Sequence, residues 1–146
     1  MKIEEMLSKG FIKAIETDEK EIKKVLGLSE RDIKVAKKNI ENDDYDWALA
    51  IAYNAMLQAG KALMLSKGYR PAGEYRHVAV IEFLHSEFGK QVTDRLIDIL
   101  GSLRKRRHKV VYEQAGSVSE GEALEAIKFA EEFVNKVKEI LKLKND

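Results

Sequence analysis

Residues 104–112, RKRRHKVVY, gather five Lys or Arg side chains, one histidine and one tyrosine within nine positions. On a helix, Arg107 and His108 stand three and four residues after Arg104, and the three would form one compact cationic patch. A guanidinium group can donate two parallel hydrogen bonds to a phosphate, which lysine cannot do. The stretch therefore indicates a phosphate site at Arg104, Arg107 and Lys109. The alternative is a solvated helix surface with no further role.

The overall charge of the chain predicts that any attraction to nucleic acid is local. The 146 residues contain 26 basic and 25 acidic side chains, which nearly cancel to +1, so no general attraction to nucleic acid or anionic lipid is expected. There is no cysteine, which excludes disulfides, thiolate zinc sites and a cysteine nucleophile. No apolar run is long enough to span a membrane, and the N-terminus does not resemble a signal peptide. We expect a cytoplasmic protein.

Sites with well-known sequence signatures are not predicted. The sequence has no glycine-rich phosphate loop, no His-Glu-x-x-His and no nucleophile elbow. The three histidines are scattered, and the spacing of Glu82 and His85, which suits half of a di-iron site, has no second copy. We therefore predict neither a metal nor a cofactor.

Apolar residues recur at helical spacing along almost the whole chain, which predicts an all-α protein. The residues from Tyr45 to Lys67 are apolar around most of the circumference, as expected for the central buried helix. Gly27 is expected to end one short helix, and Ser29 to cap the next. The expected helices are 3–15, 22–26, 29–40, 45–67, 77–88, 90–112 and 123–141.

Short loops between long helices favour antiparallel neighbours. The sequence predicts an up-and-down four-helix bundle with an additional N-terminal helical segment. Residues 1–28 are expected to form this extension and residues 29–146 the bundle, within a single domain overall.

Several motifs, in this order, resemble the HEPN family of helical domains. They are Ala48-x-x-x-Ala52-Tyr53-Asn54-Ala55, Gly60-Lys61-Ala62-Leu63, the loop ending in Arg76-His77, and the basic stretch followed by a capped amphipathic helix. The resemblance covers about residues 29–141. It implies a four-helix bundle that dimerises through the helices bearing the basic motif.

Active members of this family are metal-independent ribonucleases in which an Arg, a polar residue and a His from each subunit meet at the twofold axis. Laid on this chain, the motif places Arg107 at the arginine position, His108 at the polar position and Tyr112 at the histidine position. A shifted alignment pairs Arg104 with His108. The arginine would stabilise charge on the scissile phosphate, and the histidine would transfer a proton.

The resemblance also implies that many members act with a small nucleotidyltransferase, the two forming a toxin–antitoxin pair. Our primary hypothesis is a homodimeric module that binds nucleotide or RNA phosphate and has such a partner. The first alternative is an active HEPN ribonuclease using Arg107, His108 and Tyr112, or Arg104 and His108. The second alternative is a purely structural helical bundle.

Overall fold

The computed structural model describes residues 1–142 of the chain. It contains six α-helices, one π-helix and one pair of short strands in that range. In chain order the elements are α1 (Ile3–Ser8), β1 (Ile12–Ala14), α2 (Glu19–Glu41), α3 (Tyr45–Ser66), β2 (Tyr69–Pro71), α4 (Arg76–Phe88), η1 (Gly89–Thr93), α5 (Asp94–Tyr112) and α6 (Glu120–Leu141).

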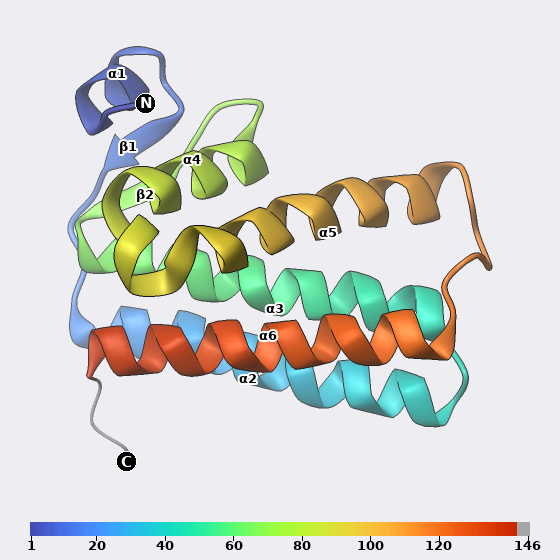
Figure 1. Cartoon of the computed structure of the whole chain (residues 1–146). Helices are drawn as coiled ribbons and strands as arrows, with labels where there is room; N and C mark the ends of the chain where they lie inside the picture. The colour runs from blue at the N-terminus through green and yellow to red at the C-terminus, as the bar shows by residue number, and fades with distance from the viewer. Residues whose placement is uncertain (143–146) are drawn as a thin grey trace.

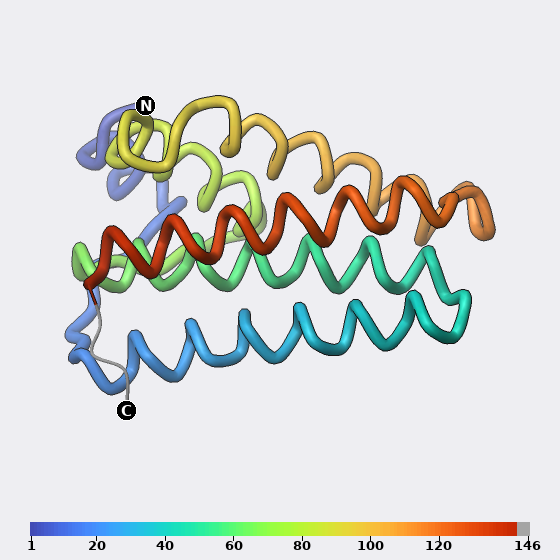
Figure 2. The backbone as a smooth tube through the Cα atoms, turned by 60° about the horizontal axis from the view of Figure 1, so that its bottom comes forward, coloured from blue at the N-terminus to red at the C-terminus, as the bar shows by residue number. Residues whose placement is uncertain are grey.

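The long helices α2, α3, α5 and α6 form the predicted bundle, and the all-α prediction is confirmed. Figure 1 shows α2, α3 and α6 running side by side along the length of the molecule. In the turned view of Figure 2, α2 and α5 lie on opposite sides, with α3 and α6 between them. The shorter helices α1 and α4 and the two strands cover one end of the bundle (Figure 1). Helix α3 therefore touches α2, α4, α5 and α6.

The composition of α3 explains why it is the central helix. Residues such as Leu49, Met56 and Leu63 are fully buried, and small alanines between them let neighbouring helices approach. By length and hydropathy alone this helix could cross a membrane, but 78% of the relevant window is buried inside the protein. The bundle core thus accounts for its apolar character.

The predicted helix over residues 3–15 is wrong in its second half. Helix α1 ends at Ser8, and Gly10 adopts a φ of +74°, which favours glycine and turns the chain. The following residues form β1, which pairs antiparallel with β2 so that Ile12 lies opposite Pro71 and Ala14 opposite Tyr69. Apolar residues at helical spacing could not reveal this pairing, because the partner strand lies more than fifty residues further along the chain.

The predicted break at Gly27 and the predicted cap at Ser29 are also wrong. Helix α2 runs without interruption from Glu19 to Glu41, and its N-terminus is capped by Asp18, which accepts a hydrogen bond from the Glu21 amide at 2.8 Å. Ser29 is fully buried in the helix and donates a hydrogen bond from Oγ to the Ala55 carbonyl oxygen at 2.6 Å. The boundary drawn between residues 28 and 29 therefore falls within a helix.

The second half of the chain follows the predicted order of helices more closely. The expected break between helices at Gly89 is absent, because the π-helix η1 leads directly from α4 into α5. His85 spans this connection, with Nδ1 2.8 Å from Asp94 and Nε2 3.2 Å from Asp98. Ser119 caps α6 and accepts a hydrogen bond from the Glu122 amide at 3.1 Å. These contacts fix the position of α5, which carries the basic stretch.

Candidate phosphate-binding site

The side chains of the basic stretch on α5 lie in different surroundings. Lys105, His108 and Lys109 are exposed, whereas Arg104, Arg106 and Arg107 are half-buried. Buried Val110 marks the side of the helix that faces the core. Because successive residues are turned by about 100° in a helix, Arg106 and Arg107 lie on opposite sides of that line.

Arg106 is fully engaged in holding the loop before α6. Its Nε and Nη2 donate to the two carboxylate oxygens of Glu122 at 2.8 and 3.0 Å, a bidentate arrangement. The same guanidinium donates to Gln114 at 3.1 Å and to the Ser117 hydroxyl and carbonyl at 3.2 and 3.3 Å. The hydrogen bond to Glu122 raises the pKa of Arg106 above its ordinary value. This arginine therefore has a structural role.

Arg107 lies on the other side of that line, toward α3. Its Cζ lies 5.9 Å from the centroid of the Tyr53 ring, within the range of a cation–π contact. Tyr53 is buried in α3, and its hydroxyl lies 2.8 Å from Nδ1 of His77 at the start of α4. A chain of contacts thus joins α5, α3 and α4 through Arg107, Tyr53 and His77.

Positive charge gathers around the Tyr53–His77 pair. Burial lowers the pKa of His77, and the charges of Lys61, Arg107 and Arg104 lower it further. Burial also lowers the pKa of Lys61, with a smaller effect from Arg76. We call Lys61, Arg76, Arg104 and Arg107 the cationic cluster.

The cationic cluster has no acidic partner within residues 1–142. None of the ion pairs in that range involves one of its four members. Burial raises the pKa of Tyr53 to about 12, although Arg104 and Arg107 act in the opposite sense. The phenol of Tyr53 is therefore neutral and does not balance the positive charge. A bound anion could balance it.

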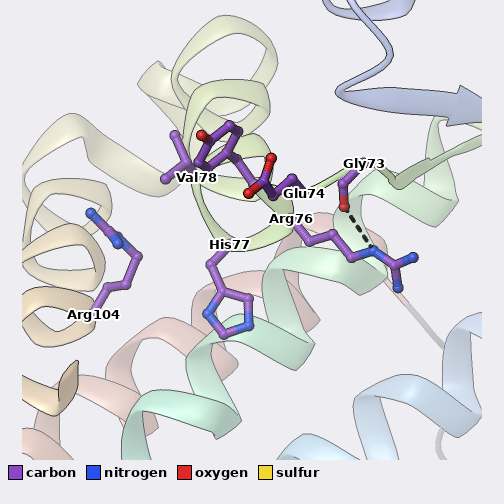
Figure 3. Close-up of a pocket in the computed structure, with 7 residues that line it drawn as sticks. Gly73, Glu74, Arg76, His77, Val78 and Arg104 are labelled. Carbon is purple, nitrogen blue, oxygen red and sulfur yellow. Dashed lines mark hydrogen bonds between the residues drawn. The ribbon is translucent and has the colours of Figure 1, made fainter. Parts of the chain in front are cut away.

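A pocket of about 570 Å³ opens beside this cluster. Figure 3 shows Arg104 of α5 on one side of it and His77 of α4 opposite, with Val78 above. The guanidinium of Arg76 is turned away from Arg104, and its Nε donates to the Gly73 carbonyl at 3.3 Å. The complete lining is Gly73, Glu74, Tyr75, Arg76, His77, Val78 and Arg104. The pocket is thus a concave surface at the junction of α4 and α5 that combines Arg104 and His77 with one acidic residue, Glu74.

The structure brings only some of the predicted site residues together. Arg104 and Arg107 both lie near His77, as their joint effect on its pKa indicates. His108 is exposed, and its ring packs against that of Tyr112 with centroids 4.8 Å apart. Tyr112 is 70% exposed. Neither of these two, nor exposed Lys109, lines the pocket beside Arg104.

Sequence reasoning did not assign Tyr53, Lys61 or Arg76 to the site. The apolar surroundings of Tyr53 favoured a role in the core, which it also has. Lys61 carried a usable signal, because it is a single basic residue within the long apolar stretch of α3. A charge on such a helix indicates either a buried partner or a ligand.

Exposed apolar side chains flank the cationic cluster. Trp47 is 61% exposed and lines a smaller pocket of about 180 Å³ together with Val110, Val111 and Ala115. Asp46 also lines that pocket, and its carboxylate accepts hydrogen bonds from the amides of Gly116 and Val118 in the loop before α6. On the other side of the cluster, Tyr75 and Val78 are partly exposed. Such surfaces favour association with another protein.

The model of the HEPN domain family matches residues 22–140, which is most of the chain. This chain belongs to the HEPN domain family.

Two relatives come from Methanocaldococcus jannaschii. The protein named "Putative toxin MJ0605" is 30% identical over 127 residues, covering 84% of this chain and 90% of the relative. "Putative toxin MJ0142" is 24% identical over 128 residues, covering 86% and 85%. The crystal structure of TT1696 from Thermus thermophilus superimposes with a TM-score of 0.65 at 20% identity, covering 81% of this chain and 96% of that one. The last match supports the fold.

Proposed function

We propose that this HEPN protein is a toxin-like module that binds the phosphates of RNA or of a nucleotide at the cationic cluster. The observation that carries the proposal is the absence, within residues 1–142, of any acidic partner for Arg104, Arg107 and Lys61. Half-buried cations without a partner are costly to keep together. A phosphate between them would relieve that repulsion and accept charge-assisted hydrogen bonds.

The proposed assembly is a homodimer formed along the face of α5. Trp47, Val111 and Tyr112 expose apolar surface beside the arginines. Burying this surface against a second copy would provide the driving force for association. It would also bring two cationic clusters toward one ligand. The twofold arrangement implied by the family supports this geometry.

The proposed protein partner is a small nucleotidyltransferase acting as an antitoxin. Two relatives carry the name toxin, and a toxin needs a partner that restrains it. The resemblance to HEPN pairs implies the class of that partner. We also propose a cytoplasmic location, in keeping with a chain that lacks cysteine.

The second candidate function is RNA cleavage without a metal ion. One observation favours it, namely an imidazole, His77, held beside arginines at a pocket. His108 offers another imidazole on the exposed side of α5, one turn from Arg104. In either arrangement an arginine would stabilise negative charge on the phosphate, and a histidine would move the proton.

A pair of neighbouring substitutions tests phosphate binding. Arg104→Gln and Lys105→Gln remove the same charge from adjacent positions, but only Arg104 faces the pocket. Losing a charge-assisted contact should weaken binding of a fluorescent single-stranded RNA by about tenfold for Arg104→Gln. Lys105→Gln should change it by less than about twofold.

Salt dependence gives the control for this experiment. The slope of log affinity against log salt should become shallower by about 0.7 for Arg104→Gln and stay unchanged for Lys105→Gln. Equal effects of the two substitutions would contradict the proposal, because they would place the RNA on the solvent side of α5. Intact RNA after long incubation with wild type would exclude the cleavage alternative.

A further inference from the structure

His77 occupies an unusual position among the three histidines of the chain. It stands in the first turn of α4, lines the pocket with Arg104, and contacts the buried hydroxyl of Tyr53 at 2.8 Å. The two rings are also close, with centroids 5.7 Å apart. This histidine is therefore held in one place by a core residue while its ring remains at the pocket.

The groups that surround His77 are mostly positive. Helix α3 contributes the cationic Lys61 and the neutral Tyr53, and α5 contributes Arg104 and Arg107. On its own element and the preceding loop, Arg76 and Glu74 line the same pocket. Glu74 is the one acidic residue of that lining, and it forms no ion pair in the described part of the chain.

We propose that His77 is a ligand of the bound phosphate and takes up a proton when the phosphate binds. This inference rests on the proposed function and adds a residue and a proton to its binding site. In the free protein, burial and the surrounding cations favour the neutral imidazole. A phosphate near Arg104 and Arg107 reverses the local potential, so the same imidazole becomes a favourable place for a positive charge.

The Tyr53 hydroxyl can serve both protonation states because it both donates and accepts. When His77 is neutral, the hydroxyl donates to unprotonated Nδ1, and Nε2 carries the proton. When His77 is protonated, Nδ1–H donates to the tyrosine oxygen instead. Nε2–H then remains as a charged donor for a phosphate oxygen. The added proton comes from solvent, and no other bond changes.

The direction of the pH effect follows from linkage. Cations and burial lower the pKa of His77 in the free protein, and a bound phosphate raises it. Between the two pKa values, each binding event takes up a proton. Affinity is therefore highest at low pH and falls as pH rises through the pKa of the complex. Each unit of difference between the two pKa values corresponds to about a tenfold change in affinity.

Proton NMR can follow each histidine separately because the chain has three. The probe is a single-stranded 2′-O-methyl RNA octamer, which cannot be cleaved through its 2′ oxygen. The imidazole signals are assigned with His77→Gln, His85→Gln and His108→Gln. In the free protein the His77 signal should titrate below the ordinary histidine value of about 6.5. With the octamer, its midpoint should move to higher pH.

Calorimetry in two buffers of different ionisation enthalpy gives the number of protons that the protein takes up when the octamer binds. Wild type and His85→Gln should take up protons on binding the octamer near pH 6. His77→Gln should lose that uptake and bind with an affinity that changes little with pH. His85 is a suitable control because it faces Asp94 and Asp98 at the other end of α4.

The outcomes separate this inference from the proposed function. Binding of the octamer with an unchanged His77 midpoint would overturn the inference and leave phosphate binding intact. A shift of the His108 signal alone would also overturn it, because the phosphate would then lie on the exposed side of α5. No binding at all would overturn both.

Discussion

Arg106 and Arg107 are neighbours in the sequence and differ completely in their surroundings. Arg106 makes five hydrogen bonds across the loop to α6, two of them to the carboxylate of Glu122. Arg107 has no acidic partner within residues 1–142 and lies against the Tyr53 ring. The difference shows that composition of a basic stretch does not define a site. What matters is whether the fold has already supplied each charge with a partner.

One side of α5 therefore contributes to stability, and the other to the proposed phosphate binding. The side with Arg106 joins α5 to α6 by interactions that are complete in the free protein. The side with Arg104 and Arg107 is left with unbalanced charge near a pocket. Proteins commonly give up stability at functional sites in this manner. The comparison can be tested by exchanging single residues on each side.

The largest effect on stability is expected from Arg106→Gln. Loss of the bidentate contact should lower the free energy of unfolding by about 1–3 kcal/mol, because a charged acceptor loses its partner. Arg107→Gln loses one cation–π contact, and about 0.5–1 kcal/mol is expected. Urea unfolding measures both losses of stability. The affinity of the folded proteins for RNA should fall more for Arg107→Gln than for Arg106→Gln.

Glu122→Gln provides the control for the Arg106 experiment. In a double-mutant cycle, Arg106 and Glu122 should show a favourable coupling energy, since each of the two substitutions removes the same contact. Equal stability losses for Arg106→Gln and Arg107→Gln would show that the two sides of α5 do not differ as described.

A smaller effect, of opposite sign, is expected from Lys61→Met. This change removes a half-buried charge without a partner and keeps an unbranched side chain of similar length. The free energy of unfolding should rise by about 0.5–1 kcal/mol, while affinity for single-stranded RNA falls a few-fold. Lys37→Met, which removes an exposed lysine paired with Glu131 at 3.0 Å, should give no such gain. A loss of stability in Lys61→Met would indicate that Lys61 already has a stabilising role.

Much of the fold could be predicted because the apolar pattern of the long helices is unambiguous. Helix α3 was identified from its apolar circumference, and it is the most buried helix. The failures came where a distant segment supplied the missing partner. Strand β1 exists because β2 pairs with it. The buried hydroxyl of Ser29 within α2 is satisfied by a hydrogen bond that it donates to the Ala55 carbonyl oxygen. Neither partner can be read from the local sequence.

The candidate site was predictable in part for the same reason. Arg104 and Arg107 belong to one helix, so their spacing alone predicts that they lie together. Tyr53 and His77 come from α3 and α4, and only the packing of these helices against α5 brings them to the arginines. The sequence likewise could not tell Arg106 from Arg107, because Glu122 is sixteen residues away.

The most direct test of the central claim is a crystal structure of the protein with the 2′-O-methyl RNA octamer. The account predicts a phosphate within hydrogen-bonding distance of the Arg104 or Arg107 guanidinium, with His77 contacting it and Arg106 still bound to Glu122. Phosphates held by Lys105 and Lys109, with Arg104 and Arg107 turned to solvent, would contradict it.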